Sequence, residues 1–129
     1  MRTTTAIIER SKDNLFSVYT NEYCFIGFGN TAHEAIDDFY LAYKEFQEFD
    51  EYKNIPKDLS FIFVYDTSSF LQLFKDRIGL ANLQAITGIN RRQLHHYASG
   101  VSRPSKKTVQ RIQEGIKKYG EELCKVQLI

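Results

Sequence analysis

The first third of the chain alternates apolar and polar residues in a way that predicts extended structure. Residues 3–9 (TTTAIIE) are rich in β-branched side chains, and residues 15–19 (LFSVY) follow them after the polar stretch SKDN. The two stretches therefore predict a β-hairpin with a four-residue connection. A third extended stretch is expected at residues 23–29 (YCFIGFG). The apolar run at residues 60–65 (SFIFVY) predicts a fourth strand, and its continuous apolar character favours a central position in the sheet.

An amphipathic helix is expected between the third and fourth strands. Thr31 and Glu34 have the spacing of a capping box, in which each side chain bonds to a backbone N–H at the start of a helix. Apolar residues then recur at the helical period, namely Ala32, Ala35, Ile36, Phe39, Tyr43 and Phe46. Pro56, in the polar loop that follows, cannot continue the helix. Residues 1–66 are therefore predicted to form a β-β-β-α-β domain.

The pattern changes after residues 66–69 (DTSS), which offer a domain boundary and an N-cap. Apolar residues then recur at the helical period in short segments that glycines separate. We expect helices at residues 70–77, 80–87, 91–98, 105–118 and 121–126. In the fourth of these, Val109, Ile112 and Ile116 form the stripe that faces the core. The predicted fold class is thus α+β, with an all-helical domain at residues 70–129.

The composition is that of a globular protein, with 129 residues, of which 43% are hydrophobic and 26% charged. No apolar run approaches the roughly 20 residues of a membrane-spanning helix, and the N-terminal stretch lacks the apolar core of a signal peptide. We therefore expect a cytoplasmic protein without a membrane partner. Cys24 and Cys124 lie far apart and form no CxxC motif, so they are expected to be buried, reduced thiols outside any disulfide or zinc site.

The formal net charge of +1 conceals an uneven distribution. Residues 1–69 carry six Lys and Arg against twelve Asp and Glu, a net charge of −6, whereas residues 70–129 carry eleven against four, a net charge of +7. From Arg77 to Gln113 there are seven basic residues and no acidic one. Because a carboxylate would repel the phosphate backbone of DNA, an acid-free stretch of this kind favours contact with nucleic acid.

The most basic part of the chain has the spacing of a helix-turn-helix. Two short helices are joined by TGIN, where Gly88 permits the turn, and apolar residues on both sides can fix the angle between the helices. The outer face of the second helix carries the side chains that we expect to contact base edges in the major groove, namely Arg91, Arg92, His95 and His96. Those expected to contact phosphate groups surround the start of the next helix, namely Arg103, Ser105, Lys106 and Lys107. The alternative is a solvated basic face over a small helical core.

Two parts of the chain resemble known families. Residues 80–112 (LANLQAITGINRRQLHHYASGVSRPSKKTVQRI) resemble the helix-turn-helix of Cro and phage-repressor regulators, with Gln84 at a position that is usually alanine. Residues 5–19 and 29–46 resemble the HicB-type antitoxin domain, a truncated ribonuclease-H-like β-β-β-α-β fold. The residues that match its G-[DN]-T-x-x-E-A motif are Gly29, Asn30, Thr31, Glu34 and Ala35.

The resemblance implies an antitoxin of a type II toxin–antitoxin system. Family members neutralise a HicA-type toxin, a small RNA-cleaving protein, so residues 1–66 are expected to bind such a toxin, which their negative charge would attract. Residues 70–129 are expected to bind operator DNA as a homodimer or higher homo-oligomer and to repress the protein's own operon. The residues that contact the toxin stay open: Phe25, Phe28 and Tyr40 are candidate anchors, although a core position is favoured for each. The alternative is a stand-alone transcription regulator whose first domain senses a small ligand or only dimerises.

A ribonuclease-H-like fold raises the question of catalysis, because active members bind metal ions with several carboxylates. The acidic candidates are Glu9, Asp13, Asp37, Asp38 and Asp66. Their spacing gives no convergent set, because the two adjacent aspartates point to different sides of one helix. His95 and His96 are adjacent as well, so a metal chelate formed by both is not expected. We therefore expect no metal, no cofactor and no enzymatic activity.

Overall fold

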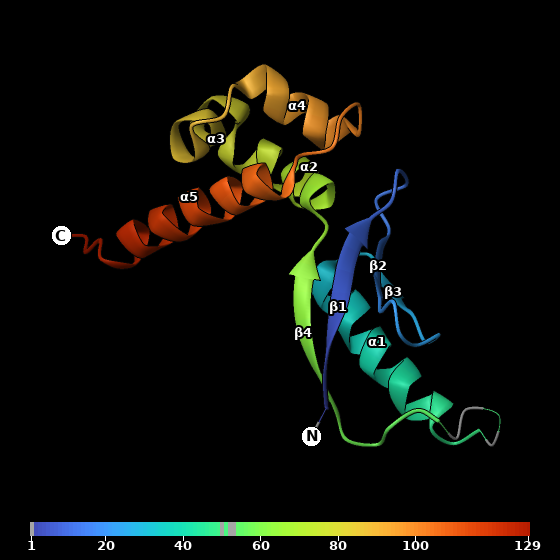
Figure 1. The fold of residues 1–129 in the computed structure, drawn as a ribbon. Coiled ribbons are helices and arrows are strands. Elements are labelled where there is room, and N and C mark those ends of the chain that lie inside the picture. Colours follow the sequence, from blue (N-terminus) through green and yellow to red (C-terminus); the bar gives the residue numbers. More distant parts are fainter. Residues whose placement is uncertain (1, 50, 52–53) are drawn as a thin grey trace. The chain divides into compact units, whose positions relative to one another are not determined.

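The computed structural model describes residues 2–49, 51 and 54–129. The chain divides into two compact units, residues 1–69 (unit 1) and residues 70–129 (unit 2). The elements in chain order are β1 (Arg2–Arg10), β2 (Phe16–Tyr19), β3 (Gly27–Gly29), α1 (Ala32–Phe46), β4 (Leu59–Tyr65), α2 (Thr67–Ile78), α3 (Leu80–Thr87), α4 (Arg91–Ser99) and α5 (Lys106–Cys124). The described residues thus form an α+β fold, as the sequence predicts, and their strands form one mixed sheet (Figure 1).

In unit 1, α1 lies along one face of the sheet (Figure 1). The strand order is β3-β2-β1-β4. β1 and β2 form the predicted antiparallel hairpin, with Ile7 opposite Tyr19, and β4 runs parallel to β1, with Ile62 opposite Thr5. The hairpin turn holds Asn14 in the left-handed region, at φ 67°, which asparagine adopts more readily than most residues. α1 provides the crossover that a parallel pair of strands needs.

β4 lies at the edge of the sheet, so the prediction that residues 60–65 form a central strand is wrong. Alternate side chains of β4 have different surroundings. The Phe61 ring packs against α1, with its centroid 4.9 Å from that of Phe39, whereas Ile62 and Val64 are 56% and 41% exposed. Successive strand residues point to opposite faces of the sheet. Residues 60–65 form a continuous apolar run because the β4 side chains that point away from α1 are apolar as well. An apolar run alone cannot distinguish this arrangement from a central strand.

The segment before β3 differs from the prediction in two ways. Regular pairing covers only Gly27–Gly29, and Phe25 is instead fully buried, with its ring centroid 5.1 Å from those of Phe39 and Tyr43. Cys24 is exposed because Phe25 takes the buried position beside it, and Cys124 is exposed at the end of α5. The expectation of two buried thiols is therefore wrong.

The start of α1 has the predicted cap. The Thr31 side chain accepts a hydrogen bond from the backbone N–H of Glu34 at 3.1 Å, and Glu34 Oε2 accepts one from the N–H of Asn30 at 2.9 Å. β3 passes very close to this helix, because a Cβ added to Gly27 would overlap the backbone of Phe39. Glycine at position 27 is therefore required by the close approach of the two backbones.

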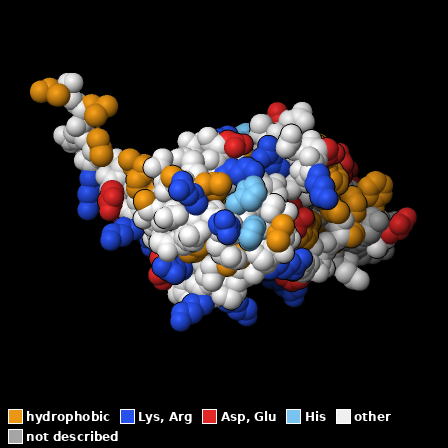
Figure 2. Space-filling model, turned by 90° about the horizontal axis from the view of Figure 1, so that it is seen from above, with side chains coloured by type: hydrophobic (Ala, Val, Ile, Leu, Met, Phe, Trp, Pro, Cys, Tyr) orange, Lys and Arg blue, Asp and Glu red, His pale blue; other side chains and the backbone are white. Residues whose placement is uncertain are grey.

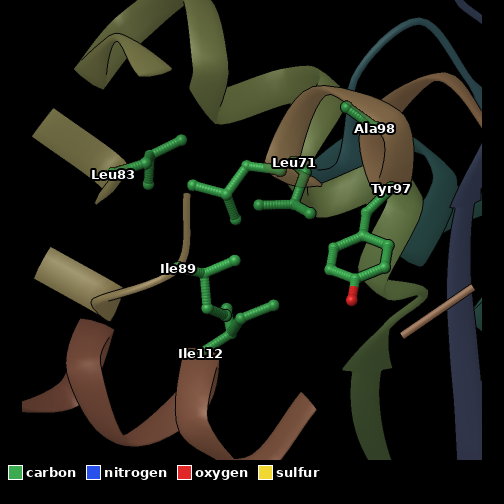
Figure 3. Packing of buried hydrophobic residues seen from close by; sticks show 7 residues of the cluster. Leu71, Leu83, Ile89, Tyr97, Ala98 and Ile112 are labelled. Atoms are coloured by element: carbon green, nitrogen blue, oxygen red, sulfur yellow. The ribbon is translucent and has the colours of Figure 1, made fainter. Parts of the chain in front are cut away.

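Unit 2 consists of helices around one hydrophobic cluster, formed by Leu71, Leu83, Ile89, Leu94, Tyr97, Ala98 and Ile112 (Figure 3). α2 begins at Thr67, where Asp66 Oδ2 accepts a hydrogen bond from the N–H of Ser69 at 3.0 Å. The last two predicted helices are a single one, since α5 continues through Gly120. Glycine costs only about 1 kcal/mol in a helix interior, too little to end a helix of good helix formers. None of the helices in the described ranges is long and apolar enough to span a membrane.

We expect Gly27→Ala to destabilise unit 1 by at least about 2 kcal/mol, because the added methyl group meets rigid backbone. Gly120→Ala is the matched control: it meets nothing within 4 Å, and alanine is about 1 kcal/mol better than glycine in a helix. Urea unfolding followed by circular dichroism measures both free energies of unfolding. Equal stability of the Gly27→Ala variant and the wild type would contradict the close approach of β3 and α1.

Candidate nucleic-acid interface

Two short helices, α3 and α4, meet at a tight turn in unit 2. α3 ends at Gly88, which has a left-handed backbone (φ 74°) and donates its N–H to the Gln84 carbonyl at 2.7 Å. Ile89 then enters the hydrophobic cluster, and Asn90 caps α4 by accepting a hydrogen bond from the N–H of Arg92 at 2.8 Å. The predicted turn is therefore present, and its glycine is needed because a left-handed φ is unfavourable for most other residues.

The angle between α3 and α4 is fixed by the side chains that both helices bury. Leu83 of α3 and Leu94 of α4 are fully buried, and Tyr97 is nearly so (Figure 3). Thr87 is buried at the end of α3; its hydroxyl donates to the Leu83 carbonyl at 2.7 Å and accepts from the Ile89 N–H at 3.2 Å. The polar groups inside the turn are thus paired, which is required of buried groups.

Gln84 joins α3 directly to the start of α4. Its Oε1 accepts a hydrogen bond from the backbone N–H of Arg91 at 2.9 Å. The first N–H groups of a helix have no partner within the helix, and here Gln84 supplies one from the preceding helix. Gln84 therefore has a positioning role in this chain.

The outward side of α4 carries three of the four residues predicted to contact bases. Arg91, Arg92 and His95 are exposed, while His96 is half-buried. This follows from the helical period, because Leu94, Tyr97 and Ala98 face the core. A shallow depression is lined by Asn90, Arg91, Arg92 and Gln93. Histidine side chains lie among Lys and Arg side chains on the face that Figure 2 shows.

The residues predicted to contact phosphate lie at and before the start of α5. Arg103, Lys106 and Lys107 are exposed. The Ser105 hydroxyl caps α5, accepting from the Thr108 N–H at 3.2 Å. The Ser105 hydroxyl is therefore used to cap the helix. The N–H groups at the start of α5 favour an anion, and the two lysines in the first turn add positive charge there.

Two long-range hydrogen bonds that sequence reasoning missed hold this surface in place. Arg111 of α5 donates from Nη2 to the Gly88 carbonyl at 3.0 Å, and Gln72 of α2 donates from Nε2 to the Ala98 carbonyl at 2.9 Å, at the end of α4. Each satisfies a carbonyl near the end of a helix. No local signal marks either pair, because the partners are 23 and 26 residues apart.

The acidic candidates of unit 1 have separate structural partners. Glu9 accepts from the Tyr19 hydroxyl at 2.6 Å, Asp38 accepts from the Phe28 N–H at 2.8 Å, and Asp66 caps α2. Asp37 lies 3.4 Å from exposed His33. Asp13 lies in the hairpin turn. Among the residues that the structure describes, no three His, Cys, Asp or Glu side chains are grouped so that they could hold a metal ion.

Desolvation and hydrogen bonds in unit 1 shift the pKa values of Tyr19 and Asp13. Desolvation, together with the hydrogen bond to Glu9, raises the pKa of Tyr19 to about 12. Hydrogen bonds from the Ser11 hydroxyl and the Leu15 N–H lower the pKa of Asp13. Both shifts favour the protonation state that the fold uses, a neutral Tyr19 donor and an ionised Asp13 acceptor.

Comparisons of the chain with family models, with curated proteins and with solved structures find no match. Function is therefore inferred from the residues and their geometry.

We expect Gln84→Ala to lower the free energy of unfolding of unit 2 by about 0.5–1.5 kcal/mol, because the Arg91 N–H loses its acceptor. Gln84→Glu keeps an acceptor oxygen and places a negative charge at a helix N-terminus, which is favourable, so it should retain the stability. Urea unfolding of the three proteins measures the difference. The same loss in both variants would show that the hydrogen bond to Arg91 does not stabilise the turn.

Proposed function

We propose that unit 2 binds operator DNA through a helix-turn-helix formed by α3 and α4. One observation carries the proposal: Arg91, Arg92 and His95 project from a short helix whose other side is buried, within a stretch of the chain that has no acidic residue from 77 to 113. A helix of this kind fits the major groove of B-DNA, where its first residues reach base edges.

The exposed side chains then divide into two groups by chemistry. Each arginine can donate two hydrogen bonds to O6 and N7 of a guanine, and His95 can donate to the same acceptors. Arg103, Lys106 and Lys107 lie outside the recognition helix and bind phosphate, together with the N–H groups at the start of α5. Base contacts give sequence preference, and phosphate contacts give affinity that falls with added salt.

Replacing Arg91 or Arg92 with alanine should weaken binding to the promoter region upstream of the chain's own gene by about 1–3 kcal/mol. Binding to a scrambled duplex should change much less. Fluorescence anisotropy on both duplexes measures the two affinities. Equal losses on both duplexes would mean that these arginines only contact phosphate. No loss on either duplex would mean that the basic side of α4 is a solvated surface that does not bind DNA.

Replacing Lys106 or Lys107 with alanine should weaken binding to both duplexes alike. The slope of log affinity against log salt concentration should become shallower by about one unit for each phosphate group that is no longer bound. A titration at several salt concentrations measures the slope. Sequence-selective weakening would contradict the assignment of these lysines to phosphate.

We infer further that unit 1 neutralises a HicA-type toxin, so that the whole chain is an antitoxin that acts in the cytoplasm and represses its own operon. Three features support this role. Residues 29–35 match the motif of the HicB-type domain, residues 1–69 have a net charge of −6, and the open face of the sheet carries exposed apolar side chains. On that face, opposite α1, Phe28, Ile62 and Val64 are exposed. An exposed apolar face on an acidic domain fits a basic protein partner.

Ile62→Lys should reduce the affinity of the full chain for the small basic protein encoded beside it by about tenfold or more, since it places a positive charge among the exposed apolar side chains of the open face. Leu41→Lys is the matched control, because Leu41 is similarly exposed (52%) but lies on α1. Co-expression and affinity purification, followed by a binding titration, test both. Equal binding by the two variants would place the toxin elsewhere.

The alternative function is a stand-alone transcription regulator whose unit 1 senses a small ligand or only dimerises. The same purification separates the two, because a stand-alone regulator binds its promoter but captures no neighbouring gene product. The five acidic candidates of unit 1 have separate roles in hairpin, cap and helix contacts, and this favours a binding domain over an enzyme.

A further inference from the structure

The apolar stripe of α5 continues beyond the part of the helix that packs in unit 2. Apolar residues recur with spacings of three and four, at Val109, Ile112, Ile116, Tyr119, Leu123 and Val126. This is the pattern of a and d positions in a heptad repeat, which places them on one side of a helix. Val126 follows the helix end, in the turn where its N–H donates to the Leu123 carbonyl.

The first half of this stripe belongs to the core of unit 2. Ile112 is buried in the hydrophobic cluster, and Ile116 packs against it. α5 approaches α3 most closely at Gly115, where an added Cβ would overlap the Ile86 carbonyl oxygen. The core therefore accounts for the stripe as far as Ile116.

The second half of the stripe lies in solvent. Tyr119, Leu123 and Val126 are 39%, 53% and 58% exposed, and Leu128 and Ile129 follow them, both exposed. The end of α5 extends past the other helices of unit 2 (Figure 1). Five large apolar side chains within the last eleven residues are more than scattered surface residues require.

The exposed half of the stripe lies in residues 114–129, and the charge of this segment indicates which partner covers it. It has three basic and three acidic residues, so its net charge is zero, whereas residues 77–113 have seven basic residues and no acidic one. In a symmetric dimer the same surface of each copy is in contact, so an interface at the basic stretch, or at unit 1 with its charge of −6, would bring like charges together. They can meet without net repulsion at residues 114–129, where the apolar stripe also lies.

We propose that the second half of α5 is a homodimer interface, in which Tyr119, Leu123 and Val126 pack against the same residues of a second copy. The interface is short, because it spans little more than one heptad. Small interfaces of this kind give weak complexes, so the dimer dissociates on dilution. Its role in operator binding rests on the proposed function, but the self-association does not.

The dimer explains how a nine-residue recognition helix could find one site in a genome. A single α4 reads only a few base pairs, whereas two copies read two half-sites. When the interface links the two copies, the second half-site binds at a high effective concentration. Loss of the interface should therefore weaken binding to a paired site far more than to a single half-site.

The test is the mass of the full chain in solution, measured by sedimentation equilibrium over a range of concentrations. The wild type should rise from the mass of one chain toward that of two, while Leu123→Glu should stay at the mass of one chain. Val101→Glu is the matched control: Val101 is also exposed (73%) in unit 2 but lies in the loop after α4, and this variant should dimerise as the wild type does. Unchanged circular dichroism confirms that the variants fold.

Two outcomes would overturn the proposal: a wild type that stays monomeric at every concentration, or a Leu123→Glu variant that dimerises like the wild type. The first is expected if another protein covers the stripe, and the second if two copies of the chain meet at a different surface. A parallel measurement uses duplexes from the promoter region with one or two half-sites. Leu123→Glu should lose about tenfold or more in affinity for two half-sites and less than about twofold for one. Dimerisation without any DNA binding would disprove the proposed function and leave the interface standing.

Discussion

The proposed recognition surface depends on the burial of one side of α4. A helix of nine residues is not stable by itself in water, so α4 exists because Leu94, Tyr97 and Ala98 are buried against the other helices of unit 2. The same burial determines which residues project outward. Since the core fixes the rotation of the helix about its axis, Arg91, Arg92 and His95 share the solvent side, and His96 is partly withdrawn.

The parts of the fold that the sequence predicted are those governed by neighbours along the chain. Thr31 caps α1, alternation in the first twenty residues gives the hairpin, and Gly88 ends α3 in a left-handed turn. One failure concerns a property that tertiary contacts decide, and the other a small difference in local free energy. Whether residues 60–65 lie at the centre or the edge of the sheet depends on which strands pair with them, and whether Gly120 ends a helix depends on a free energy of only about 1 kcal/mol. The exposure of Arg91, Arg92 and His95 on α4 was predictable from the helical period. The hydrogen bonds of Arg111 to Gly88 and of Gln72 to Ala98 were not, because the partners lie far apart in the sequence.

β4 and α5 share one feature. Each carries more apolar side chains than it buries in the core of its unit. In β4 the two-residue period places Phe61 against α1 and leaves Ile62 and Val64 exposed on the opposite face. In α5 the helical period places Ile112 inside unit 2, and the same stripe continues to Leu123 in solvent. Exposed apolar surface is unfavourable in water, so an excess that continues the pattern of a core is the best indication of where a partner binds.

α5 also links the separate parts of the proposed function mechanically. Its first turn carries Lys106 and Lys107, its middle supplies Ile112 to the core and Arg111 to the turn before α4, and its last turns carry the proposed dimer interface. At 1.5 Å per residue, Leu123 lies about 18 Å along the helix axis from Arg111. A continuous helix transmits orientation over that length, so packing between two copies at Leu123 would determine how far apart, and at what angle, their two α4 helices are held. Because α5 continues through Gly120, a short apolar contact near Leu123 would determine the distance between the two α4 helices. That distance would in turn determine the spacing of the two DNA half-sites.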